Sequence, residues 1–351
     1  MANGSAPHRD SPPRRPSLLL YGMYDARIPA SAPRVRIALL ADALERRARL
    51  VRADRGRWQR LAALPNVLWQ LRRVDAVYVE SPTGASMPWD LLALAAARAM
   101  RRPVGIYFRD AYQLFRDLYP PGSFRQRLSD LAWRFSIRLL RRLATVPFAP
   151  SSGLATALRL RRAVLLPPGT DPRQPDLGAG EQPIVAYVGA LNAADGFDRL
   201  LDAMALVRAE LPAARLLVVS GSTAGSLPDW VDLVAGSRGD LPRLLGAARA
   251  CVIPRPINRY TDLARPVKLA DYLSLGKPVV ATAAAETAAL LAPSGAGLLV
   301  ADDAAAIAAG LLSVLRDAAL AERLAAAARA LAVAPGSTWD DRAAEIVERL
   351  T

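Results

Sequence analysis

The only two lysines of this chain lie in one short stretch, RPVKLADYLSLGKPVVAT, whereas arginine occurs 44 times. Pro266 suits the first turn of a helix and Gly276 suits the residue just past its end, so the pattern predicts a helix over 266–275 and then a buried strand. Lys268 falls in the first turn, where the helix dipole disfavours a cation while the backbone amides bind anions. A phosphate held between Lys268 and these amides explains the lysine better than helix stability does.

Asp271 follows Lys268 by three residues and therefore shares its face of the predicted helix. Its carboxylate could accept hydrogen bonds from hydroxyls of the same phosphate compound, which is the chemistry of a nucleotide-diphosphate ligand. The alternative is a surface ion pair between Lys268 and Asp271 on an ordinary helix, and the residues alone favour it. We expect Lys277 to be only a cation at the edge of the strand.

Cysteine and histidine usage removes other classes of chemistry. Cys251 is the only cysteine and His8 the only histidine, and His8 lies in a Pro/Ser/Arg-rich tail that we expect to be disordered. A Ser-His-Asp triad, a Cys-His pair and a His-ligated metal are thereby excluded. The sequence has no P-loop pattern, no GxGxxG after the first strand of either half, and no run approaching the roughly 20 apolar residues of a membrane span.

Positive charge is concentrated in the first half of the chain. Residues 1–180 carry 30 arginines against 13 acidic residues, whereas residues 181–351 carry 16 basic residues against 19 acidic ones. A basic face can attract nucleic acid, an anionic membrane leaflet or phosphorylated substrates, or it can be a solvated surface. No basic stretch is interleaved with stacking aromatic residues in any recognisable nucleic-acid-binding module, which disfavours nucleic acid.

Apolar strand-like runs alternate with helical patterns along the chain, which predicts parallel sheets in two α/β domains. The first set begins at PSLLLYG and the second at IVAYVGA. The predicted organisation is a basic tail over 1–16, an α/β domain over 17–172, a linker over 173–183, a second α/β domain over 184–335 and a terminal helix over 336–351.

The stretch IPRPINRYTDLARPVKLADYLSLGKPVVAT resembles the donor-binding signature of the retaining GT-B glycosyltransferases of family 4. The segment STWDDRAAEIVERL is similar to that family's Trp-bearing terminal helix, which returns to the other domain. The resemblance covers 184–351 well and the N-terminal half only in pattern. It implies two Rossmann-like α/β/α domains facing each other across a cleft, with the nucleotide-sugar donor on the C-terminal domain and the acceptor on the basic N-terminal domain.

Followed residue by residue, the resemblance assigns three donor contacts. Lys268 would bind the donor diphosphate, Asp271 would replace a glutamate on the donor ribose, and Gly189 would let the donor approach the first strand. The chain also departs from the family, because GALNAADG places Ala190 and Asp195 where an arginine and a lysine often hold the diphosphate.

Two arginines are expected to replace these missing phosphate contacts. Arg255 and Arg265 flank the loop before the helix, and a guanidinium can bridge phosphate oxygens bidentately. The family's E-x7-E spacing is also imperfect, because Leu263 lies eight residues before Asp271. Asp262, one position away, is the candidate for the first glutamate's role, unless that role is absent.

The reaction implied is the transfer of a sugar to an acceptor hydroxyl with retention, in which the departing diphosphate takes the acceptor proton. Lys268, Arg255 and helix amides would stabilise the leaving group, and no metal cofactor is expected. Asp110 ends the strand PVGIYFRD and could orient the acceptor, although capping the next helix is the role the residues favour. Gly22 ends the first strand and could admit a substrate, or it is a turn glycine. The competing hypothesis is a degenerate GT-B domain that binds a polyanion or partner without catalysis.

The segment SFRQRLSDLAWRFSIRLLRRLAT carries two apolar stripes at helical spacing. We expect the domain core to take the first stripe, formed by Phe124, Leu128, Leu131, Phe135 and Leu139. The second group lies nearly opposite and comprises Trp133, Ile137 and Leu140, beside Arg127, Arg134, Arg138 and Arg141. Either Trp133, Arg134 and Arg138 face an anionic leaflet, or the helix is packed on both sides, and the sequence does not choose.

The membrane alternative carries expectations about location and acceptor. It implies a cytoplasmic protein that is peripheral on the inner face of the cytoplasmic membrane. The acceptor would then be a lipid-linked sugar or a lipid, in keeping with the family's frequent role in cell-envelope polysaccharide or glycolipid assembly. A soluble saccharide acceptor remains the other alternative.

Overall fold

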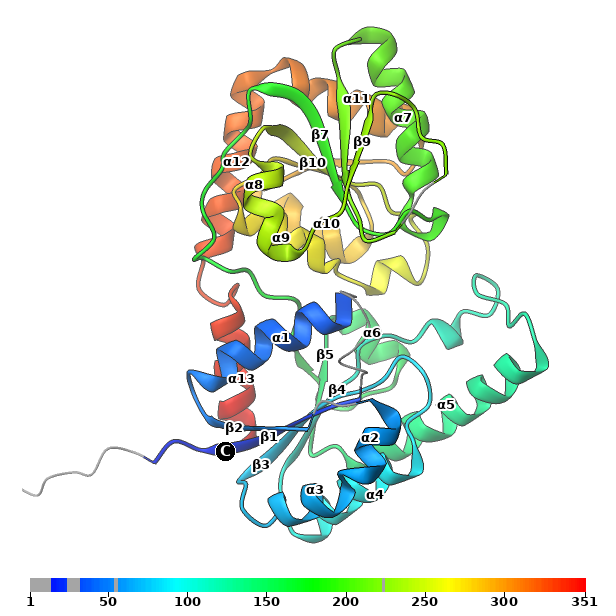
Figure 1. The fold of residues 1–351 in the computed structure, drawn as a ribbon, viewed down its shortest axis with the longest axis vertical. Helices are drawn as coiled ribbons and strands as arrows, with labels where there is room; N and C mark the ends of the chain where they lie inside the picture. Colours follow the sequence, from blue (N-terminus) through cyan, green and yellow to red (C-terminus); the bar gives the residue numbers. More distant parts are fainter. Residues whose placement is uncertain (1–13, 24–31, 54–55, 223–224) are drawn as a thin grey trace, which may run out of the picture.

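The computed structural model describes residues 14–23, 32–53, 56–222 and 225–351, so the tail with His8 lies almost entirely outside the described residues. Its strands form two six-stranded parallel sheets, one above the other in Figure 1. The strands of the first sheet are β1 (Ser17–Gly22), β2 (Arg49–Arg52), β3 (Ala76–Glu80), β4 (Val104–Tyr107), β5 (Val146–Ala149) and β6 (Val164–Leu165). They lie in the order β2-β1-β3-β4-β5-β6.

Helices cover both faces of the first sheet. They are α1 (Ala32–Glu45), α2 (Arg57–Ala62), α3 (Leu64–Gln70), α4 (Pro88–Ala99), α5 (Phe124–Leu143) and α6 (Ser152–Ala157), with a short 3₁₀ turn η1 (Tyr112–Leu114). Because side chains alternate along a strand, Leu18 and Leu20 of β1 pack toward α1, while Leu19 and Tyr21 join the core formed with α3, α4 and α5. The sheet is therefore buried on both sides, as parallel sheets are.

The second sheet repeats this architecture. Its strands are β7 (Gln182–Val188), β8 (Arg215–Val219), β9 (Val231–Val234), β10 (Ala248–Ile253), β11 (Val279–Thr282) and β12 (Leu298–Val300), in the order β12-β11-β10-β7-β8-β9. The helices are α7 (Phe197–Glu210), α8 (Leu241–Leu245), α9 (Val267–Ser274), α10 (Ala285–Ser294), α11 (Ala304–Arg316) and α12 (Ala318–Val333), with 3₁₀ turns η2 (Ala193–Asp195), η3 (Arg238–Asp240) and η4 (Thr261–Leu263). The cores on the two faces contain α7 with α11 on one side and α8 with α9 on the other.

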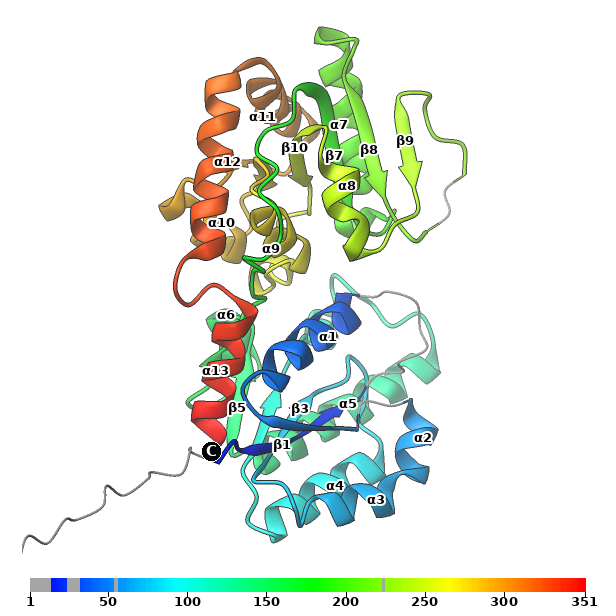
Figure 2. The ribbon, with the colours of Figure 1, turned by 60° about the vertical axis from the view of Figure 1, so that its left-hand side comes forward.

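The chain ends on the first domain. Helix α13 (Trp339–Leu350) packs beside α1, and its buried Trp339, Ile346 and Leu350 join the core under β1 (Figure 2). Two connections therefore join the domains, one before β7 and one between α12 and α13. They lie side by side, since Thr170 and Thr338 form an isolated parallel bridge.

Among the described residues, no single helix is long and apolar enough to cross a membrane. Helices α11 and α12 are long and apolar enough only when they are taken together, and the chain bends by 99° between them.

Helix α5 presents the opposite face to the core from the one expected. Trp133 is 1% exposed, and Ile137 and Leu140 are buried with it, whereas Phe124 is 74% and Phe135 60% exposed. The assignments of the first stripe to the core and of Trp133 to a membrane are therefore both wrong. The buried face also contains the polar residues Ser136 and Asp130. Because these residues interrupt its apolar pattern, the sequence did not indicate that this face is the buried one.

Arg134 and Arg138 differ in their surroundings. Arg138 is exposed, whereas Arg134 is half-buried, with its Nε shielded and without a hydrogen-bond partner among the described residues. Only Arg138 of the three expected membrane-facing residues is thus fully at the surface.

Lys277 is buried rather than a cation at a strand edge. It is fully shielded, and its Nζ donates to the carbonyls of Gly246 at 3.0 Å and Ala248 at 2.9 Å. The lysine thus satisfies two buried acceptors between α8 and β10, which the spacing of the sequence could not reveal.

Candidate active site

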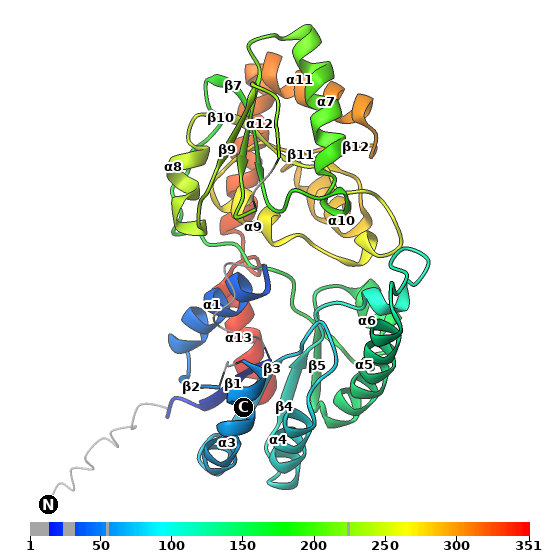
Figure 3. The same cartoon turned by 45° about the vertical axis from the view of Figure 1, so that its right-hand side comes forward.

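The carboxyl ends of the strands in the two sheets face each other. Ser151, just after β5, donates its hydroxyl to the carbonyl of Leu263 at 2.6 Å, and Leu263 lies in the loop after β10. In Figure 3, α9 lies at the edge of the upper domain above α1 and α6 of the lower one. Ligands of open α/β sheets bind at this edge, next to the point where the strand order reverses.

That reversal in the second sheet falls between β7 and β10. The two strands pair in parallel, with Ala186 opposite Cys251, so their carboxyl ends are neighbours. Gly189 directly follows β7, Arg255 follows β10, and the loop beyond Arg255 leads into α9. Three residues singled out in the sequence, Gly189, Arg255 and Lys268, therefore come from elements that converge at one place.

Lys268 is a buried cation at this place. Its Nζ is shielded from solvent, has no hydrogen-bond partner among the described residues, and lies 4.3 Å from the centroid of the Tyr187 ring. Burial lowers the pKa of Lys268 to about 8, a shift that Asp195 opposes and Arg255 reinforces. A surface ion pair with Asp271 is therefore wrong. An uncompensated buried charge is costly, and such groups cluster at functional sites.

Two glycines allow the loop after β7 to approach its neighbours. Gly189 has a φ of +149°, and a Cβ there would lie 2.6 Å from the Nζ of Lys268. Gly196 has a φ of +81°, and a Cβ there would lie within 1.8 Å of the carbonyl oxygen of Pro254. Both positions favour glycine, because L side chains rarely adopt these conformations, and at Gly196 the backbone of Pro254 also leaves no space for a side chain.

The two expected arginines have different partners. The Nε of Arg255 lies 3.8 Å from the carboxylate of Asp195 and forms no hydrogen bond with the described residues. Arg265 donates to Glu286 at 3.2 Å, and burial together with Arg265 lowers the pKa of Arg342 to about 10. Arg255 is thus grouped with Lys268, while Arg265 belongs to a neighbouring cluster.

Asp271 has a partner that the sequence did not predict. The Nε of Arg238 donates to its Oδ1 at 2.6 Å, and Arg238 also lies 3.9 Å from Asp171 in the connection before β7. Burial raises the pKa of Asp271, and the guanidinium of Arg238 opposes this. A ribose hydroxyl would therefore share the carboxylate of Asp271 with Arg238.

The loop before α9 gives Asp262 and Leu263 structural roles. Asp262 accepts the N–H of Ala285 at 2.8 Å, so it satisfies an amide at the start of α10. Leu263 packs against the other domain, where a Cβ on Gly153 would lie 2.7 Å from its Cδ2. The donor contact expected for Asp262 stays a prediction, and one of its carboxylate oxygens already holds the amide of Ala285.

Asp110 presents a carboxylate at the carboxyl end of β4. Its Oδ2 accepts from Thr83 at 3.3 Å and from Arg109 at 3.0 Å, while its Oδ1 is buried without a hydrogen-bond partner among the described residues. The following turn η1 has no side-chain cap. The helix-capping role that the residues favoured is therefore wrong, and one carboxylate oxygen is left to bind a ligand.

Gly22 lies at the corresponding reversal of the first sheet. It is the last residue of β1 and pairs in register with Glu80 of β3. Because Gly22 belongs to the strand, the alternative of a simple turn glycine is wrong. Its backbone lies at the edge that faces the second domain.

Aromatic residues that the sequence did not single out connect the two sides. The ring of Tyr260, before α9, contacts Tyr119 and Phe115 of the first domain at centroid distances of 5.3 and 5.8 Å. Burial raises the pKa of Tyr260, and so does the charge of Asp110, while Arg255 lowers it. The charges of Asp110 and Arg255, one from each domain, therefore both act on Tyr260. Only the folded chain reveals this, because no spacing in the sequence relates these residues.

Two facing Rossmann-like domains of this kind define the GT-B fold, and solved structures share it along nearly the whole chain. Sucrose-phosphate synthase from Thermosynechococcus elongatus is 18% identical, with a TM-score of 0.62, over 95% of this chain and 98% of that chain. Anabaena HepE in complex with UDP-glucose is 17% identical, with a TM-score of 0.69, over 95% and 99%. WaaG, a glycosyltransferase involved in lipopolysaccharide biosynthesis, is 16% identical, with a TM-score of 0.59, over 94% and 99%.

Sequence comparison matches the second domain to a family model. Residues 182–317 match the family model described as glycosyl transferases group 1, and this segment includes Gly189, Arg255 and Lys268. No curated protein sequence matches the chain. The second domain thus matches glycosyl transferases group 1, and the chain as a whole has the GT-B fold of the solved structures.

Proposed function

We propose that this protein transfers a hexose from a nucleotide-diphosphate sugar, with UDP-glucose as the first candidate, to an acceptor hydroxyl. The observation that carries the proposal is Lys268, whose ammonium is buried beside Gly189 without a hydrogen-bond partner among the described residues. HepE, which has the same fold, binds UDP and UDP-glucose. A donor diphosphate bound where the strand order reverses, between β7 and β10, would supply a negatively charged partner for the ammonium of Lys268.

The donor site would work by electrostatic stabilisation of the leaving group. As the bond to the sugar breaks, negative charge develops on the diphosphate, and preorganised cations and amides stabilise it. Lys268, Arg255 and the first amides of α9 are the groups placed to do this. Neither Lys268 nor Arg255 Nε has a hydrogen-bond partner among the described residues, so no existing hydrogen bond of these nitrogens must be broken when the donor binds.

The acceptor would bind from the first domain, opposite Lys268. The free Oδ1 of Asp110 can accept the hydrogen bond of an acceptor hydroxyl and so orient it toward the sugar. The acceptor proton then passes to the departing diphosphate oxygen, which balances the transfer without a protein base. Tyr260 packs against Phe115 and Tyr119 of the first domain and would help to exclude water from between the domains.

We further propose an acceptor from cell-envelope polysaccharide or glycolipid assembly, handled on the cytoplasmic side of the membrane. The basic first half of the chain supports an anionic acceptor or surface. WaaG, which shares the fold, is involved in lipopolysaccharide biosynthesis.

The proposal is tested by measuring release of the nucleotide from a panel of UDP-, GDP- and ADP-sugars, first with water and then with candidate lipid-linked acceptors. We expect one UDP-sugar to be cleaved, with wild-type rates far above those of Lys268→Ala. Ala190 and Asp195 in the loop after β7 instead favour a degenerate, non-catalytic domain that binds a polyanion. Failure of every nucleotide sugar both to bind and to react would support that second candidate.

A further inference from the structure

The outward face of α5 carries a row of large apolar side chains. Phe124, Leu128, Leu131 and Phe135 follow one another at helical spacing, and all are exposed. Figure 3 shows α5 along the outer edge of the first domain. Contiguous exposed apolar groups of this size mark an interaction surface.

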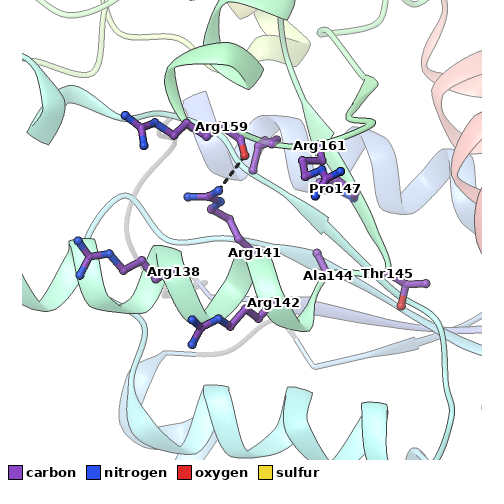
Figure 4. A pocket seen from close by; sticks show the side chains of 9 residues that line it. Arg138, Arg141, Arg142, Ala144, Thr145, Pro147, Arg159 and Arg161 are labelled. Atoms are coloured by element: carbon purple, nitrogen blue, oxygen red, sulfur yellow. Dashed lines mark hydrogen bonds between the residues drawn. The ribbon is translucent and has the colours of Figure 1, made fainter.

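The C-terminal end of the same helix lines a basic pocket of about 380 Å³. Figure 4 shows the arginines that surround it, which are Arg138, Arg141, Arg142, Arg159 and Arg161. The only hydrogen bond among these side chains and the pocket backbone is from Arg141 to the carbonyl of Arg159, at 2.9 Å. No carboxylate among the described residues forms an ion pair with any of the five.

The apolar row and the basic pocket form one continuous surface. Arg138 lies seven residues after Leu131, and Arg142 lies seven after Phe135, so these arginines extend the same helix face. Between residues 120 and 166 the chain has nine arginines and a single acidic residue, Asp130, which is buried. Within the part of the chain that the structure describes, no carboxylate forms an ion pair with the arginines of this surface.

We propose that this α5 surface, formed by the apolar row together with Arg138, Arg142 and Arg159, docks the first domain on an anionic lipid bilayer. Amphipathic helices with basic borders bind in the interface with their apolar side chains at the boundary of headgroups and acyl chains. The pocket arginines bind lipid phosphates, for which a guanidinium offers bidentate geometry. Charge complementarity favours this occupant, and a nucleic acid would leave the four apolar side chains unburied.

The proposal is independent of the transfer reaction. The pocket lies where Thr145 and Arg161 precede β5 and β6, at the amino ends of the strands, whereas the donor site lies beyond the carboxyl ends. Loss of membrane binding would therefore leave donor binding intact. The surface is also the reverse of the Trp133 face.

Co-sedimentation of the full chain with vesicles tests the proposal. Wild-type protein is expected to bind phosphatidylcholine vesicles that contain phosphatidylglycerol, to bind pure phosphatidylcholine far less, and to be released by salt. The triple variant Phe124→Ser/Leu131→Ser/Phe135→Ser should lose at least about tenfold in partitioning. The triple variant Arg138→Gln/Arg142→Gln/Arg159→Gln should lose about a hundredfold, since each surface cation contributes about 1 kcal/mol, or about fivefold.

Matched variants elsewhere provide the controls. Leu206→Ser/Val333→Ser removes exposed apolar side chains from the second domain, and Arg47→Gln/Arg243→Gln/Arg323→Gln removes three exposed arginines outside the surface. Both should bind vesicles like the wild type, and the thermal melting of all variants should be similar.

Three results would overturn the proposal. The first is a lack of binding at low salt, and the second is equal binding to neutral vesicles. The third is a loss in the control variants as large as that in the surface variants. A concentration-dependent dimer that the apolar triple variant dissociates, without vesicle binding, would assign the surface to a second copy of the chain. Binding of soluble polyphosphate but not of vesicles would assign it to a soluble polyanion.

Discussion

A side chain at position 189 and the ammonium of Lys268 would compete for the same space, because a Cβ on Gly189 would lie 2.6 Å from the Nζ. The glycine therefore leaves the end of β7 open to the lysine in its present position. There it is buried against the Tyr187 ring, 4.3 Å from the centroid, and forms no hydrogen bond or ion pair with the described residues. This pair of residues is the centre of the proposed donor site.

Lys268→Met should stabilise the protein while removing donor binding. The pKa of the lysine falls from its ordinary 10.5 to about 8 on folding, so the unfolded chain binds the proton more tightly and the charged form destabilises the fold at neutral pH. A pKa shift of this size corresponds to roughly 3–4 kcal/mol in the free energy of unfolding. Urea unfolding at pH 7 measures it, and a less stable Lys268→Met variant would contradict the assignment.

Donor affinity should fall as the pH rises through about 8. Only the protonated lysine attracts a diphosphate, and in the free protein that proton is lost around pH 8. Titrations with UDP between pH 6.5 and 9.5 should show the loss, approaching tenfold per pH unit at most for a single proton. In Lys268→Arg any remaining affinity should be flat over this range, because a guanidinium stays charged. A wild-type affinity for UDP that does not change over this pH range would show that Lys268 does not bind the diphosphate.

Asp110→Asn should slow transfer without weakening the binding of the nucleotide-sugar donor. The amide keeps the shape of the side chain but removes the negative charge next to Arg109. The hydroxyl of the sugar acceptor then forms a weaker hydrogen bond at this position. We expect a loss of about tenfold or more in kcat/KM for the acceptor, in line with the loss of an interaction to a charged group. The dissociation constant for UDP should stay within about twofold. An unchanged rate would leave Asp110 a structural partner of Thr83 and Arg109.

Transfer should require no divalent metal. Lys268 and Arg255 can neutralise the diphosphate directly. Their charge-assisted hydrogen bonds to phosphate are stronger than hydrogen bonds between neutral groups. Donor cleavage measured in EDTA should equal that measured in Mg²⁺. Complete loss in EDTA, restored by Mg²⁺ or Mn²⁺, would disprove this expectation.

Local signals in the sequence were enough to locate α9 and its lysine. Pro266 and Gly276 mark the helix ends, and a lysine in the first turn of an arginine-rich chain is unusual enough to point to an anion. The order of strands and helices likewise predicted two parallel sheets. These features depend on neighbours in the sequence, which is why they could be predicted.

Features that depend on distant residues could not be predicted in the same way. Arg238 reaches Asp271 from a 3₁₀ turn on another segment, and no periodicity relates the two. Helix α5 has apolar groups on two faces, so its pattern alone could not show which one the sheet covers. Lys277 is buried because carbonyls of α8 and β10 converge on it.

The two faces of α5 can be distinguished by stability. Trp133→Ala removes a side chain that is 1% exposed and should cost about 3–5 kcal/mol in the free energy of unfolding. Phe135→Ala removes one that is 60% exposed and should change it by less than about 0.5 kcal/mol. Denaturant titration compares the two variants, and equal losses would mean that both faces are packed.

Calorimetric titration of UDP-glucose into the wild type, Lys268→Ala and the exposed control Arg243→Ala tests the donor site most directly. Removal of a charge-assisted phosphate contact from a buried site typically costs about 1.5–3 kcal/mol, or roughly 10- to 150-fold in affinity. We expect a loss of this size in Lys268→Ala and none in Arg243→Ala, with both variants folded. Wild-type binding that Lys268→Ala retains unchanged would contradict the account.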